Sequence, residues 1–163
     1  MLTKGAMVEE SRRIAEPHRP ATPERVKCGI DCVVLTCFDS EFGFWAPVFR
    51  PCGIRMHRAQ TLEKADFLLT VTEATVLLTD LVFLDGSWAD AVAMLTTFHP
   101  IVASLVMAEA VDQPFVSDAI NGRAFGVLWK PVQLGELDRS IRSASEACEE
   151  RAVWHHNQAS IAV

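Results

Sequence analysis

Two charged residues follow apolar runs in this 163-residue sequence, at positions where their side chains could do chemistry. Asp80 ends the run "TVLLTD", and Lys130 ends "FGVLWK" directly before Pro131. A buried strand has no structural need for a cation at its end, so we expect Lys130 to face a partner. Pro131 removes a backbone donor at this point and favours the start of a helix after it.

Other side chains with chemical potential lie at or after the ends of two more apolar runs. Thr36, Cys37 and Asp39 follow "CVVL", whereas Ala108 ends "SLVMA". A thiol at such a position could be a nucleophile, but the sequence places no histidine to activate Cys37. We therefore expect an ordinary packed thiol there.

An alternation of strands and helices must position these residues. Continuous apolar runs, typical of strands that are buried on both faces, predict strands over residues 32–38, 76–80, 101–110 and 125–131, and residues 54–60 are a candidate second strand. Apolar spacing and capping signals, with Ser40 and Thr61 as N-caps and Gly53 as a stop, predict helices over residues 40–53, 61–73, 87–100, 112–122 and 132–152.

The alternation predicts an α/β fold, a (βα)5 doubly wound sheet of five parallel strands with the flavodoxin-like topology. Parallel strands need crossover connections, and the crossover helices bury both faces of the sheet. The binding crevice of such a sheet lies at the carboxyl ends of its strands. We therefore expect Asp80 and Lys130 to meet in that crevice.

Composition predicts one domain with a tail at each end. Residues 1–28 carry many charges and three prolines and predict a flexible tail, residues 29–150 predict the folded domain, and residues 151–163 predict a C-terminal tail. The formal net charge of −6 argues against a nucleic-acid ligand, because such ligands require clustered Lys and Arg. The sequence shows no apolar run as long as a membrane span and no signal peptide, so we expect a cytoplasmic protein without membrane contact.

Cysteine and histidine spacing predicts no metal or redox motif. The five cysteines are an odd number and never form a CxxC pair, and only His155 and His156 among the five histidines are adjacent. We interpret the thiols as reduced and the His pair as part of a solvated tail.

Two stretches resemble the receiver domain of bacterial two-component response regulators, the CheY-like family. "VLLTDLVF" is similar to the segment that bears the family's phosphoacceptor aspartate, and "AINGRAFGVLWKPVQLGELDRSI" is similar to its fourth helix, fifth strand, Lys-Pro pair and last helix. The resemblance covers about residues 31–147. It implies that Asp80 is the phosphoacceptor position and that Lys130, before Pro131, would neutralise an acyl phosphate there.

The sequence departs from the family at the positions that bind magnesium. Receivers carry two acidic residues after the first strand, and the matching residues here are Thr36 and Cys37. A hard divalent cation requires several oxygen ligands, which a hydroxyl and a thiol supply poorly. Asp39 and Asp80 are only weak metal candidates, so we expect no cofactor and no bound magnesium.

The positions that report phosphorylation in the family also differ. The switch residue, normally Ser or Thr, matches Ala108, and the aromatic residue of the fifth strand matches Val127. A methyl group cannot donate a hydrogen bond to a phosphoryl oxygen. The resemblance therefore implies a degenerate receiver, or pseudo-receiver.

Three functions remain open at this point. The first is a non-enzymatic signalling module that acts through contacts with a protein such as a histidine kinase or a downstream regulator, or as a homodimer. Its contact face would be the fourth helix, the fifth strand and the last helix, the face that receivers commonly use. The second is a phosphorylatable single-domain response regulator with Asp80 as phosphoacceptor. The third is a flavodoxin-like small-molecule-binding enzyme, although no GxGxxG motif or P-loop supports it.

Overall fold

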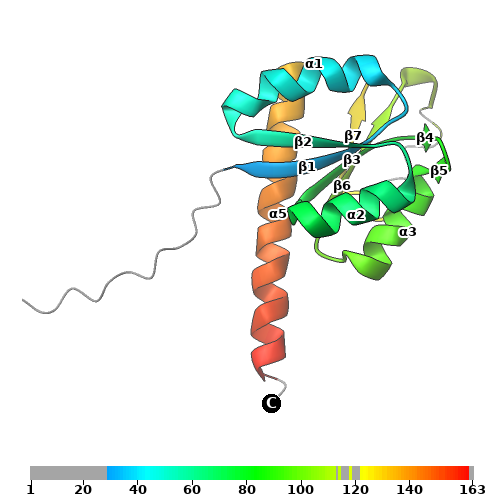
Figure 1. The fold of residues 1–163 in the computed structure, drawn as a ribbon. Coiled ribbons are helices and arrows are strands. Elements are labelled where there is room, and N and C mark those ends of the chain that lie inside the picture. Colours follow the sequence, from blue (N-terminus) through cyan, green and yellow to red (C-terminus); the bar gives the residue numbers. More distant parts are fainter. Residues whose placement is uncertain (1–28, 113, 115–117, 119–121, 162–163) are drawn as a thin grey trace, which may run out of the picture.

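A five-stranded parallel sheet forms the centre of the protein (Figure 1). In this computed structural model the described residues are 29–112, 114, 118 and 122–161. The strands of the sheet are β1 (Ile30–Leu35), β2 (Ile54–Ala59), β3 (Val76–Asp80), β6 (Ala103–Ala108) and β7 (Gly126–Trp129). They lie in the order β2-β1-β3-β6-β7, which confirms the predicted doubly wound topology.

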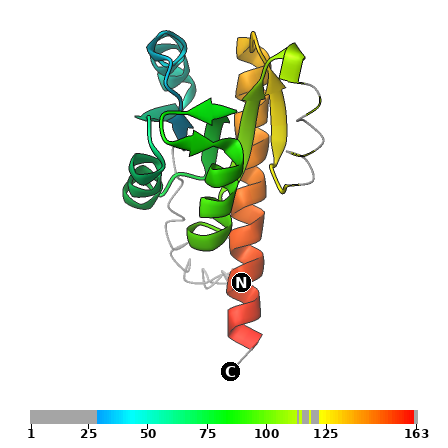
Figure 2. The same ribbon diagram turned by 90° about the vertical axis from the view of Figure 1, so that its right-hand side faces the viewer.

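Helices cover both faces of this sheet (Figures 1 and 2). The helices α1 (Asp39–Phe49) and α5 (Leu134–Ile161) pack on one face, and their buried side chains include Trp45 of α1 and Ile141 of α5. The helices α2 (Leu62–Thr72) and α3 (Trp88–Phe98) pack on the other face through residues such as Leu69 and Leu95. Burial on both faces explains why the strands read as continuous apolar runs.

Capping side chains set where two of the helices begin. The hydroxyl of Thr61 accepts a hydrogen bond from the backbone N–H of Lys64 at 3.2 Å, which confirms Thr61 as an N-cap. Ser87 and Asp90 form a capping box at the start of α3, in which the Asp90 carboxylate accepts from the backbone N–H of Ser87 at 2.9 Å.

The first helix differs from its prediction at both ends. It starts at Asp39, so Ser40 is not its N-cap, and it ends at Phe49. A short 3-10 helix, η1 (Arg50–Cys52), follows it and ends at Gly53, which has a φ of 82°. Glycine adopts this left-handed conformation without steric cost, so the predicted stop at Gly53 is confirmed.

The predicted first and fourth strands were too long at their carboxyl ends. Strand β1 ends at Leu35, so Cys37 lies in the loop that follows, and β6 ends at Ala108, before the 3-10 helix η2 (Ala110–Asp112). After β3, the short strands β4 (Val82–Phe83) and β5 (Gly86–Ser87) form an antiparallel pair that the sequence did not indicate. The expected tail over residues 1–28 and most of the expected helix over residues 112–122 lie outside the described residues.

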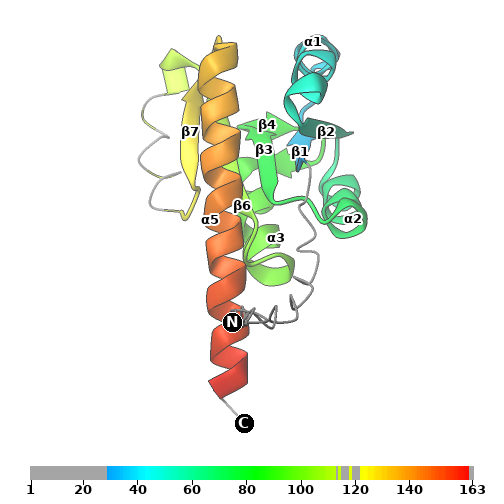
Figure 3. The ribbon, with the colours of Figure 1, turned by 90° about the vertical axis from the view of Figure 1, so that its left-hand side faces the viewer.

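The last helix continues past the expected start of a C-terminal tail at residue 151. Helix α5 runs to Ile161 as 28 continuous residues and projects beyond the sheet (Figure 3). Residues 151–161, which the sequence assigned to a C-terminal tail, therefore continue the last helix. None of the helices in the described ranges is long and apolar enough to cross a membrane.

Candidate functional site

Asp80 occupies the carboxyl end of β3 and is nearly inaccessible to solvent, with its side chain 5% exposed. The hydroxyl of Thr36, which is fully buried just after β1, donates a hydrogen bond to Oδ2 of Asp80 at 2.5 Å. The same hydroxyl oxygen accepts a hydrogen bond from the backbone N–H of Phe38 at 3.0 Å. Thr36 is therefore held in place by the loop after β1 while it binds one oxygen of the carboxylate.

Lys130 binds the other oxygen of this carboxylate. Its Nζ lies 2.7 Å from Oδ1 of Asp80, and its backbone N–H donates to the carbonyl oxygen of Ala108 at 2.8 Å. The ammonium also lies 5.2 Å from the centre of the Phe38 ring, within the range of a cation–π contact. The cation that follows β7 therefore faces the carboxylate of Asp80.

A second carboxylate, Glu41, approaches the same ammonium. Its Oε2 is 3.3 Å from Nζ of Lys130, so two carboxylates share one cation. Burial of Lys130 opposes its charge, but the hydrogen bond and charge of Asp80, together with Glu41, outweigh that effect and raise its pKa above 10.5. Lys130 is therefore fully protonated at neutral pH.

Glu41 was missed by sequence reasoning. The signal that could have found it is its place in the first turn of α1, directly after the loop that follows β1. In a parallel sheet, that turn lies over the carboxyl ends of the strands, where the crevice is. Acidic residues in the first turn also suit the positive end of the helix dipole, which is why the position did not stand out.

The structure does not bring Asp39 or Cys37 to Asp80. Asp39 is 79% exposed and forms an ion pair with Arg58 at the end of β2. Cys37 is exposed, with its sulfur 3.8 Å from the carbonyl oxygen of Val82, so the expectation of a packed thiol was wrong: β1 ends before it, and it lies in the loop. Because Asp39 pairs with Arg58 of the adjacent strand, it does not contact Asp80.

The remaining positions with family counterparts lie on or after β6 and β7. Ala108 is buried at the end of β6, and Val127 is partly buried in β7. Pro131 follows Lys130 through a cis peptide bond and is exposed, three residues before α5 starts at Leu134. Neither Ala108 nor Val127 adds a polar group to the crevice.

The donor set of this crevice does not fit a magnesium ion. Both oxygens of Asp80 are engaged, one by a hydroxyl and one by an ammonium, and Mg²⁺ requires near-octahedral oxygen coordination. Among the described side chains, no group of three or more His, Cys, Asp or Glu residues could hold a metal ion. The ammonium of Lys130 supplies the neutralising charge that a cation would otherwise provide.

Comparison with known proteins identifies the fold through structure and not through sequence. No family model matches the chain, and no curated protein matches its sequence. The signal receiver domain of an HD domain-containing protein from Pseudomonas fluorescens is similar, with a TM-score of 0.69, 17% identity, and coverage of 77% of this chain and 93% of that one.

Two further solved structures give the same result. A response regulator receiver protein from Pseudomonas putida has a TM-score of 0.63 at 19% identity, and the match covers 71% of this chain and 97% of that one. An adenylate cyclase from Rhodopirellula baltica has a TM-score of 0.72 at 12% identity and covers 80% of this chain and 97% of its own. At these identities the likeness establishes the fold, and the chain has the CheY-like receiver fold.

Proposed function

We propose that this receiver-fold protein is a non-enzymatic signalling module of a two-component or phosphorelay type system, which acts through protein contacts without magnesium-dependent phosphorylation. One observation carries the proposal: both oxygens of Asp80 are already contacted within the protein, Oδ2 by the Thr36 hydroxyl at 2.5 Å and Oδ1 by the Lys130 ammonium at 2.7 Å. A carboxylate held in this way is a poor nucleophile, since its lone pairs and charge are already engaged.

The neighbouring positions support this proposal. Transfer of a phosphoryl group depends on cations and donors that stabilise its charge. Here the positions that would hold the cation are Thr36 and the exposed Cys37, and the switch position is the methyl side chain of Ala108. Lys130 alone would remain to stabilise the charge, and Glu41 already competes for it.

Labelling with a small phosphodonor tests the proposal. The wild-type protein is incubated with phosphoramidate, with and without Mg²⁺, and its intact mass is measured beside that of an Asp80→Asn variant. We expect no phosphorylated species under either condition, and no magnesium-dependent change in the tryptophan fluorescence, to which Trp129, directly before Lys130, contributes. A receiver that is competent for phosphorylation serves as the positive control.

The same experiment separates the alternative function, a phosphorylatable response regulator. The ion pair of Lys130 with Asp80 favours that alternative, because an ammonium placed there could also stabilise an acyl phosphate. Magnesium-dependent labelling that is absent from the Asp80→Asn variant would establish it and overturn our proposal.

A further inference from the structure

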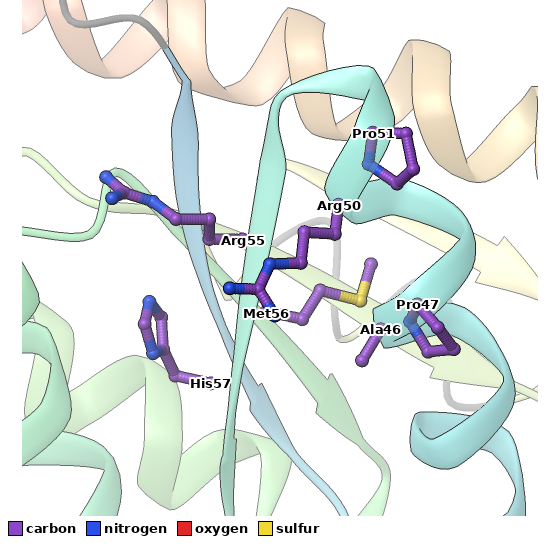
Figure 4. Close-up of a pocket in the computed structure, with 7 residues that line it drawn as sticks. All are labelled: Ala46, Pro47, Arg50, Pro51, Arg55, Met56 and His57. Atoms are coloured by element: carbon purple, nitrogen blue, oxygen red, sulfur yellow. The ribbon is translucent and has the colours of Figure 1, made fainter.

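A hollow of about 510 Å³ lies beside β2, the outermost strand on one side of the sheet. It is lined by three consecutive residues of that strand, Arg55, Met56 and His57, together with Ala46, Pro47, Arg50 and Pro51 from α1 and η1 (Figure 4). Side chains of consecutive strand residues point to opposite faces of a sheet. A hollow that all three residues line must therefore run along the edge of the strand.

The backbone of β2 presents unpaired groups to this hollow. The backbone N–H of Ile30, in β1, donates to the carbonyl oxygen of Gly53 at 2.7 Å, and that of Thr36, just after β1, donates to the carbonyl oxygen of Ala59 at 3.0 Å. Because backbone groups alternate in direction along a strand, the N–H and C=O of Met56 point away from β1. No hydrogen bond to these two groups occurs within the described ranges. An extended segment placed beside β2 could pair with them.

The side chains around the edge define what such a segment would carry. Figure 4 shows Met56 on the side of Ala46 and Pro47, whereas Arg55 and His57 point to the other side of the strand. Every second side chain of a bound segment would therefore meet an apolar surface, and the side chains between them would meet Arg55 and His57. Alternating apolar and acidic residues fit both sides.

Two guanidinium groups lie at this edge, one of them paired with a carboxylate and the other not. The Arg55 side chain is 60% exposed and bonds Asp31 through Nη2 at 2.7 Å, which leaves donors of its guanidinium for another acceptor. Arg50 is exposed and forms no ion pair with any carboxylate of the described residues. Carboxylates of a bound segment would complement these charges.

The same charges disfavour a second copy of the chain as the occupant. In an antiparallel pairing of two β2 strands centred on Met56, both edges would carry Arg50 and Arg55, and β2 has no acidic residue to face them. Like charges that meet across two strands are unfavourable. We therefore propose that the open edge of β2 binds an extended, acidic segment of a partner protein by strand addition. The proposal does not depend on the state of Asp80.

Binding of designed peptides to the full chain tests this inference. The probe is a fluorescent seven-residue peptide of alternating valine and glutamate, and the control peptide has lysine in place of glutamate. Fluorescence anisotropy should show that the acidic peptide binds and that the basic peptide does not. Increasing NaCl should weaken the binding, since exposed charges are screened by salt.

Two variants with the same charge change locate the site. Arg50→Glu should weaken binding of the acidic peptide about three- to tenfold, which corresponds to the loss of an exposed charge pair and its replacement by repulsion. Lys64→Glu, on α2, should leave the affinity unchanged. Hydrogen exchange should show that the acidic peptide protects the backbone amide of Met56.

Several results would overturn the inference. Equal affinity for the two peptides, equal behaviour of the Arg50→Glu and Lys64→Glu variants, or an unprotected Met56 amide would each exclude it. Protection of the Met56 amide by self-association in the absence of peptide would assign the edge to a homodimer instead.

Discussion

Single side chains decide the chemistry of the crevice. Thr36 occupies a position where receivers carry an acidic residue, and it donates a hydrogen bond to Asp80 where an acid would repel it. Lys130 then neutralises Asp80 from the other side at 2.7 Å. A buried carboxylate needs a paired charge and hydrogen-bond donors; Lys130 supplies the opposite charge at Oδ1, and Thr36 supplies a donor at Oδ2.

Substitution of Thr36 tests this arrangement. Thr36→Val keeps the shape of the side chain but leaves Oδ2 of Asp80 without its donor in a buried site. We expect a loss of about 1–3 kcal/mol in the free energy of unfolding, measured with urea. Thr36→Ser retains the hydroxyl and should lose less. Equal stability of the two variants would show that the hydrogen bond contributes little.

Helix α5 shows how one element serves two environments. Its first half is amphipathic and buries Leu137, Ile141 and Ala144 against the sheet, and Arg142 bonds both Asp138 and the carbonyl oxygen of Cys52. Its last turns are exposed, including Val153 and Trp154. The stability of the domain should therefore depend on the first half alone.

Truncation checks this division. Removal of residues 152–163 should change the free energy of unfolding by less than about 1 kcal/mol, because these turns contribute little burial. Ile141→Ala, in the buried half, should cost about 2–5 kcal/mol through lost contacts and the cavity that remains. Both effects are measurable by denaturant unfolding followed by circular dichroism. A large loss on truncation would mean that the exposed turns pack against something in solution.

The whole molecule is built around strands that are closed to water on both faces. Cys32 lies in the middle of this core with no exposed surface, and burial is the main cause that raises the pKa of its thiol to about 12 from 9.0. Lys130 also holds its proton more tightly in the folded protein, since its pKa is raised above 10.5. The sequence contains no tyrosine that would titrate in the same range.

These shifts predict a loss of stability in alkali. Above pH 9.0 the Cys32 thiol ionises in the unfolded chain but stays neutral in the folded one up to about pH 12, so rising pH favours unfolding across that interval. From pH 10.5 upward, Lys130 adds to this loss of stability, because it loses its proton first in the unfolded chain. Urea unfolding at a series of pH values should show this decline.

The matched variants assign the decline to the buried thiol. Cys32→Ala should reduce the slope of the unfolding free energy against pH by the equivalent of about one proton. Cys52→Ala removes an exposed thiol and should retain the wild-type slope. An unchanged slope in Cys32→Ala would contradict the assignment.

The sequence by itself was sufficient to predict where the five strands lie along the chain, that they form a parallel sheet, and that Asp80 meets Lys130. Continuous apolar runs such as Val76–Asp80 result from burial on both faces, and parallel strands place their carboxyl ends together, so local pattern carried this information. Thr61 as an N-cap and Gly53 as a stop were equally predictable, because a capping hydroxyl and a left-handed φ depend on the residue type itself.

Only the tertiary structure decided the partners at the crevice and the edge. Glu41 reaches Lys130, and Asp39 turns to Arg58, although both acids lie in the same helical turn. Which way a side chain of that turn points depends on where α1 lies over the sheet, and this position comes from long-range packing that sequence spacing does not encode. The open edge of β2 is likewise a property of strand order. A strand lies at the edge of a sheet when it has a neighbouring strand on one side only, and β2 has only β1.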